Sequence, residues 1–147
     1  LYTIWKRTAP PPSMLIFDIA DRGNCTVKRT TTNTPLQALV LLNDPQYVEA
    51  ARVLAERLIR EEKDVKKRLQ TAFRVVTSRQ PEKKELKMLE SFYQEELRNF
   101  IDNKNSAEDF LSTGNKKWDR ELDPVEIAAL GVVVNAIMNT DEAITNK

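Results

Sequence analysis

Apolar residues recur three and four positions apart through the middle of the chain, which is the spacing of one face of an α-helix. In the first such segment the apolar stripe consists of Tyr47, Ala51, Leu54 and Leu58. The pattern predicts amphipathic helices over residues 45–62, 64–79 and 81–103, and a shorter helix over 106–113.

Capping signals mark where further helices begin. Thr34-Pro35-Leu36-Gln37 is a capping box with proline at the first helical position, and it predicts a short helix over 36–42. Asp123-Pro124 marks a helix start in the same way. The helix that follows, to about Thr140, is apolar on nearly every face, so we expect it at the centre of a bundle.

Residues 1–34 lack this periodicity. Pro10-Pro11-Pro12 fixes the backbone and removes hydrogen-bond donors, so an extended polyproline-type segment is expected there. The apolar run Met14-Leu15-Ile16-Phe17 is expected to be a strand or an extended stretch. Residues 18–33 are polar and rich in turn-forming residues.

These patterns together predict an all-α fold. We expect an irregular multi-helix bundle of about six helices with an extended Pro-rich N-terminal arm over residues 1–34. The 147 residues are the length of one ordinary domain, so residues 1–147 are expected to form a single helical domain. Because the chain begins without an initiator Met, we interpret it as an excised piece of a larger protein.

The composition excludes several kinds of site. The chain contains no His, which rules out Ser-His-Asp and Cys-His catalysis, His-ligated zinc and a Cys-x-x-Cys-His haem attachment within it. A single cysteine cannot form an internal disulfide, and three scattered glycines cannot form a phosphate-binding loop. We therefore expect no cofactor in this chain.

Charge and hydropathy argue against nucleic-acid binding and against a membrane-spanning helix. The formal net charge is only +1, whereas nucleic-acid binders usually carry a larger basic excess, so no nucleic acid is expected as a partner. The longest apolar-dominated run, 127–138, is much shorter than the roughly 20 residues that a membrane-spanning helix needs. No membrane span is therefore expected.

Distinctive blocks of sequence lie at both ends of the chain. The most distinctive is residues 32–45, which read Thr-Asn-Thr-Pro-Leu-Gln-Ala-Leu-Val-Leu-Leu-Asn-Asp-Pro. The others are Leu1 to Thr8, Pro10 to Met14, Phe17-Asp18, Asp21-Arg22, Cys25-Thr26-Val27 with Arg29, and the final segment from Asp123-Pro124 to Asp141-Glu142. In these blocks the chain resembles the planctomycete surface domain one family, also called domain of unknown function 1553.

The resemblance implies a C-terminal portion of a large exported protein of the bacterial envelope, in the periplasm or at the cell surface. Such domains typically accompany a cytochrome c-like domain, and no activity is established for the family. The partners that the resemblance implies are other domains of the same parent protein, and any haem would belong to one of those domains.

The candidate interaction residues all lie in the arm. A polar network that pins the arm to the helices is our interpretation of four of them: Asp18, Arg22, Arg29 and Asn33. The alternative for these residues is a cleft for a carboxylate or a sugar, with arginine as a bidentate clamp.

Three further arm residues are candidates. Trp5 is expected to pack at a domain interface or in the core, with stacking on a sugar or a partner as the alternative. Phe17 is a candidate for docking against the rest of the parent protein. Cys25 is interpreted as a buried or half-buried structural thiol, with a reactive thiol beside Lys28 and Arg29 as the alternative.

Two functions from different classes fit these observations. The first is a non-enzymatic structural or interaction module that docks on the rest of its parent protein. The second is a ligand-binding or hydrolytic domain for envelope polysaccharide, with the arm forming one wall of a cleft and carboxylates alone doing the chemistry.

Overall fold

A computed structural model of the chain describes residues 11–19, 27, 32 and 34–144. In these residues all the regular structure is helical, so the all-α prediction is confirmed. The helices are α1 (Pro12–Ile16), α2 (Pro35–Asn43), α3 (Pro45–Glu61), α4 (Val65–Thr77), α5 (Lys83–Asp102), α6 (Lys104–Ser112), α7 (Pro124–Met138) and α8 (Asp141–Ile144). The chain divides into two compact units, residues 1–40 and 41–147, and the single domain over 1–147 remains a prediction.

Aspartates cap three of the helices, and α3 and α7 begin at the residues that the sequence predicts. Asp44, Asp64 and Asp123 each accept a hydrogen bond from the backbone amide two residues later, at the first turn of α3, α4 and α7. Proline is the first residue of both α3 and α7, where its missing amide removes no helical hydrogen bond.

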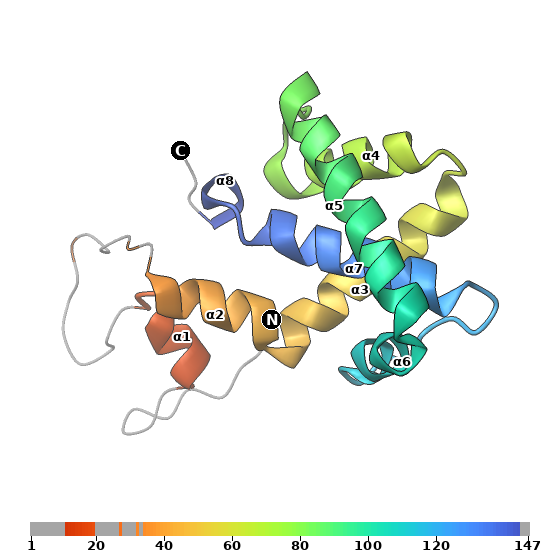
Figure 1. Ribbon diagram of the computed structural model, residues 1–147. Coiled ribbons are helices and arrows are strands. Elements are labelled where there is room, and N and C mark those ends of the chain that lie inside the picture. The colour runs from red at the N-terminus through yellow and green to blue at the C-terminus, as the bar shows by residue number, and fades with distance from the viewer. Residues whose placement is uncertain (1–10, 20–26, 28–31, 33, 145–147) are drawn as a thin grey trace. The chain divides into compact units, whose positions relative to one another are not determined.

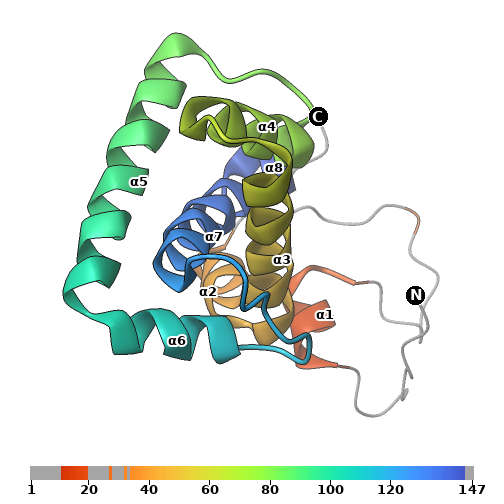
Figure 2. The same ribbon diagram turned by 90° about the vertical axis from the view of Figure 1, so that its right-hand side faces the viewer.

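Helix α7 forms the centre of the 41–147 unit. It packs against α3, α4, α5, α6 and α8, and in Figure 2 it lies between α5 and α3. Most of its side chains are buried, among them Ile127, Leu130 and Val134. The predicted central position of this helix is therefore confirmed, and burial on every side explains why it has no polar face.

One glycine and one asparagine of α7 lie where this helix closely approaches other parts of the unit. The ring of Phe110 on α6 lies so close to Gly131 that an added Cβ would be 2.9 Å from a ring carbon. The buried Asn135 donates from Nδ2 to the carbonyl of Leu42 at 3.2 Å. A glycine and an asparagine in this apolar helix thus mark close approaches to other parts of the same unit.

An arginine joins the ends of α4, α5 and α8. Arg79 donates to both carboxylate oxygens of Glu85, at 2.6 and 2.8 Å, and its Nε donates to Glu142 at 2.8 Å. Its guanidinium lies 4.8 Å from the ring centroid of Phe73. Helix α8, which the sequence pattern does not predict, is therefore tied to the α4–α5 connection (Figure 1).

In the 1–40 unit, one prediction is wrong. Met14–Ile16 belong to helix α1 and are not a strand or an extended stretch. The reason lies in the prolines: Pro11 keeps an extended conformation, with φ −57° and ψ 127°, but Pro12 occupies the first helical position, for which its fixed φ is suited. The proline run thus ends by starting a short helix.

A buried glutamine organises the same unit. The predicted capping box at α2 is formed, since Thr34 N donates to Gln37 Oε1 at 3.0 Å and Gln37 N donates to Thr34 Oγ1 at 3.3 Å. The amide nitrogen of Gln37 also donates to the Ile16 carbonyl at 2.8 Å and to Thr32 Oγ1 at 3.0 Å. One side chain therefore caps α2 and fixes the end of α1 relative to it.

Candidate interaction groove on helix α3

The loop between α6 and α7 is held on α3 through its backbone. The Glu49 carboxylate accepts hydrogen bonds from Asn115 N at 2.7 Å and from Lys116 N at 3.1 Å. Arg52 donates from Nη2 to the Lys116 carbonyl at 2.5 Å. Both backbone groups of Lys116 are thus bound by α3, which leaves its side chain to point away from the helix–loop contact.

The same contacts shape the electrostatics of the loop. The amide of Asn115 lowers the pKa of Glu49 most, so this carboxylate stays charged to lower pH than an ordinary glutamate. Further along the loop Arg60 forms an ion pair with Asp119 and lowers the pKa of that carboxyl through their hydrogen bond. The loop is therefore held at two places by charged side chains.

Beneath the loop lies a buried ion pair. Arg52 is completely buried and pairs with Glu56, one turn further along α3, which is 7% exposed. The Nε of Arg52 has no hydrogen-bond partner within the described part of the chain. Burial of two charges is tolerated only when they are paired, so this pair is a structural support for the loop.

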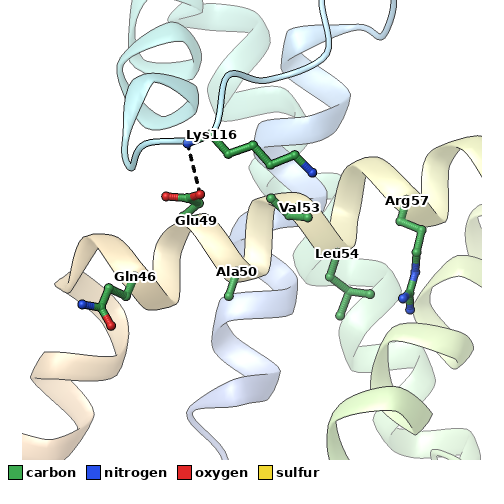
Figure 3. Close-up of a pocket in the computed structure, with 7 residues that line it drawn as sticks. All are labelled: Gln46, Glu49, Ala50, Val53, Leu54, Arg57 and Lys116. Carbon is green, nitrogen blue, oxygen red and sulfur yellow. Dashed lines mark hydrogen bonds between the residues drawn. The ribbon is translucent and has the colours of Figure 1, made fainter. Parts of the chain in front are cut away.

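A groove of about 570 Å³ runs along α3 beside this loop. Its lining is Gln46, Glu49, Ala50, Val53, Leu54, Arg57 and Lys116. Figure 3 shows Gln46, Ala50, Leu54 and Arg57 projecting on one side of α3, while Lys116 extends over Val53 toward the Arg57 end. The groove therefore has an apolar floor between polar and cationic ends.

Two smaller grooves continue the surface around the loop. One of about 480 Å³ shares Val53, Arg57 and Lys116 with the first, and adds Lys117. Another of about 390 Å³ includes Lys116, Lys117 and Trp118. Because all three grooves include Lys116, we treat them as one surface and call it the α3 groove.

The carboxylates of the α3 groove are all engaged. Glu49 binds loop amides, Glu56 pairs with Arg52, and Asp119 pairs with Arg60.

The lysines of the groove differ from these carboxylates. In the part of the chain that the structure describes, neither Lys116 nor Lys117 forms an ion pair. Arg57 has only a 3.8 Å contact to Glu61, and both side chains are more than half exposed. The charge available to a ligand in the groove is therefore positive.

The sequence-based candidate residues lie elsewhere. Trp5, Arg22, Cys25, Arg29 and Asn33 lie outside the described residues, so their proposed roles remain predictions. The two candidates that are described both lie in the 1–40 unit.

Of these two, Phe17 is half-buried at the end of α1. Asp18, with φ +52°, accepts hydrogen bonds from Thr32 N at 2.9 Å and from Thr32 Oγ1 at 2.5 Å. Asp18 thus has a structural role in the arm, with a partner that the sequence reasoning did not name.

The sequence reasoning missed the α3 groove. A signal was present, because charged residues occur at positions 49, 52, 56 and 60, at the three- and four-residue spacing of one helical face. This charged row borders the apolar stripe of the same helix, and it coincides with the side that holds the loop.

The described residues contain neither a cluster of metal ligands nor a helix that could span a membrane. No group of three or more His, Cys, Asp or Glu side chains gathers there in a way that would hold a metal ion. Among the same residues, no helix combines the length and the apolar character that crossing a membrane requires.

Comparison with known proteins gives one match. The model of a family described as protein of unknown function (DUF1553), PSD1, matches residues 1–93, which is more than half of the chain. No curated protein matches the sequence, and no solved structure matches the fold. The matched region includes α1 to α4 and part of α5, so the resemblance of the last helix to the family remains a prediction.

Proposed function

The chain belongs to the PSD1 family of proteins of unknown function (DUF1553), and from this premise we propose that it is a non-enzymatic interaction module of an exported bacterial envelope protein. Its partners are other domains of the same parent protein, among them a cytochrome c-like domain. Its place is the periplasm or the cell surface. The absence of His from the sequence supports a division of labour in which haem is held by another domain.

One observation carries the proposal: the α3 groove offers contacts for binding, but its carboxylates are all held by structural partners. Its floor is formed by Ala50, Val53 and Leu54, whereas Glu49 and Glu56 are each held by a structural partner. Acid–base chemistry by carboxylates needs an acidic side chain that reaches the substrate. An apolar floor with a polar rim is the composition of a protein-binding surface.

The alternative, binding or hydrolysis of envelope polysaccharide in a cleft formed by the arm, has less support. A carboxylate mechanism requires two acidic side chains facing one ligand. Asp18, the acidic residue proposed for that cleft, already accepts two hydrogen bonds from Thr32.

The test is calorimetric titration of this chain with the other domains of its parent protein, expressed separately. We expect a dissociation constant near or below about 1 µM, or about −8 kcal/mol. Ala50→Glu, which places a charged side chain on the exposed groove floor, should weaken binding at least tenfold. The matched control is Met88→Glu on α5, because Met88 is 71% exposed and lies outside the groove.

Absence of binding to every domain of the parent would contradict the proposal. So would equal weakening by Ala50→Glu and Met88→Glu, since that result would place the contact elsewhere. Circular dichroism melting of each variant shows that its fold is retained before binding is measured.

A further inference from the structure

We propose that the α3 groove binds an acidic amphipathic peptide segment, with apolar side chains on the groove floor and carboxylates at Arg57 and Lys116. This inference rests on the proposed function and names the chemistry of the partner.

The floor fits apolar side chains of moderate size. Ala50 is exposed, Val53 and Leu54 are half-buried, and the three lie within two turns of α3. The groove extends along this helix for the distance from Gln46 to Arg57, which is about three helical turns. A groove of that length, with its apolar residues at the centre, matches the contact face of a short helix or an extended peptide.

The charged side chains at the groove rim that are available to bind a ligand are cationic. Lys116 and Lys117 form no ion pair within the described residues, and the exposed Arg57–Glu61 contact at 3.8 Å contributes little. The nearby carboxylates already have partners. A ligand with carboxylates beside its apolar positions therefore gains ion pairs without displacing any contact that holds the loop.

The loop presents Lys116 in a fixed position. Its amide donates to Glu49 and its carbonyl accepts from Arg52, so both backbone groups are held by α3. Arg52 is in turn fixed by the buried Glu56. Because the backbone is ordered before binding, a ligand has only the lysine side chain to order, which favours affinity.

A peptide fits these features better than an acidic glycan. A glycan supplies anionic groups but no aliphatic side chains for Val53 and Leu54. The aromatic residue of the surface, Trp118, is already covered on one face by Arg120, whose guanidinium carbon lies 4.7 Å from the ring centroid. The acidic glycan is therefore the competing outcome of the test.

The experiment measures fluorescence anisotropy of a short labelled peptide of glutamate and leucine, added to the full chain. A peptide with serine in place of leucine tests the floor, and a peptide with lysine in place of glutamate tests the rim. Oligogalacturonate serves as the acidic glycan competitor. The protein variants are Arg57→Glu/Lys116→Glu and the charge-matched control Lys84→Glu/Lys87→Glu, whose exposed lysines lie on α5 outside the groove.

We expect the glutamate–leucine peptide to bind and both altered peptides to bind at least tenfold more weakly. Arg57→Glu/Lys116→Glu should reduce affinity at least tenfold, whereas the control pair should change it less than twofold. Raising salt from about 0.1 M to about 1 M shortens the Debye length from about 10 to about 3 Å, and should weaken binding.

Several results would overturn the inference. One is equal affinity for the glutamate–leucine and glutamate–serine peptides. Another is equal loss in the two charge-reversed pairs, which would indicate a general charge effect. Displacement by oligogalacturonate at matched carboxylate concentration would point to a glycan site instead.

The two proposals fail separately. Suppose that parent domains bind and that Ala50→Glu weakens this binding but Arg57→Glu/Lys116→Glu does not. The docking function then stands, and the proposal of an acidic partner is wrong. If the acidic peptide binds in the groove but no parent domain does, the groove chemistry stands and docking on the parent protein is wrong.

Discussion

Gly114 and the Glu49 side chain lie too close together for any larger residue at position 114. A Cβ added to Gly114 would be 2.1 Å from Glu49 Oε2 and 2.8 Å from Glu49 Cβ. Gly114 also has φ +94°, a backbone conformation that other residues rarely adopt. The glycine therefore allows the loop to turn at the point where Glu49 binds the next two amides.

We predict that Gly114→Ala destabilises the protein by about 1–3 kcal/mol, from backbone strain together with the clash. Urea unfolding measures the loss. In a Glu49→Ala background the clash with the Glu49 carboxylate is absent, while the backbone strain and the contact with Cβ remain, so Gly114→Ala should cost less there. Equal costs in the two backgrounds would show that the clash with the Glu49 carboxylate has no energetic effect.

The buried pair of Arg52 and Glu56 predicts an asymmetric response to mutation. Arg52→Met alone leaves the Glu56 carboxylate without its partner and should cost about 3–5 kcal/mol. The double change Arg52→Met/Glu56→Leu removes both charges and should recover at least half of that loss. A double variant less stable than Arg52→Met would contradict the prediction, and chemical denaturation measures both.

Stability should fall in acid because of Glu85. Its bidentate contact with Arg79, together with the Glu82 amide, lowers the pKa of Glu85 from 4.5 to about 2. The folded pKa is below the unfolded one, so the stabilisation is present above about pH 4.5 and is lost as pH falls toward 2. Unfolding measured across this range should be less pH-dependent in Glu85→Gln than in the unmodified chain.

Gln37→Glu separates the two roles of Gln37. The carboxylate can still accept from Thr34 N and keep the cap of α2, but it cannot donate to the Ile16 carbonyl. We expect faster amide hydrogen exchange in α1, with little change in the first turn of α2. Equal acceleration in both helices would show that the cap itself was lost.

Truncation in the core should be far more costly than truncation at the surface. Leu130→Ala on α7, at 1% exposure, should destabilise the protein by about 2–5 kcal/mol. Ile101→Ala on α5, at 52% exposure, should change stability by no more than about 0.5 kcal/mol. Similar losses from the two variants, measured by urea unfolding, would contradict the central position of α7.

Much of the fold was predictable because the helix caps and the apolar periodicity in the sequence agree with the helix starts and the buried faces in the structure. The capping box at Thr34 and the N-cap at Asp123 give the starts of α2 and α7, and the apolar stripes give the packed faces. Helix α1 was missed because the apolar run Met14-Leu15-Ile16-Phe17 is too short to show a helical period.

The groove was not predictable from the same signals. It depends on Glu49 and Arg52 binding the backbone of residues 115 and 116, more than 60 positions along the chain. Because backbone carbonyls and amides occur throughout any chain, the sequence does not show which of them will bind a distant side chain. Local periodicity therefore identifies which face of α3 is charged but not what that face holds.

The position of α7 has a consequence for the order of events during synthesis. Helices α3 to α6 leave the ribosome before α7, yet each packs against it in the finished unit. Until α7 emerges, the parts of their apolar faces that α7 covers have no permanent partner, and such surfaces favour aggregation or chaperone binding. The nascent chain must therefore keep these helices from misassembling until its central helix arrives.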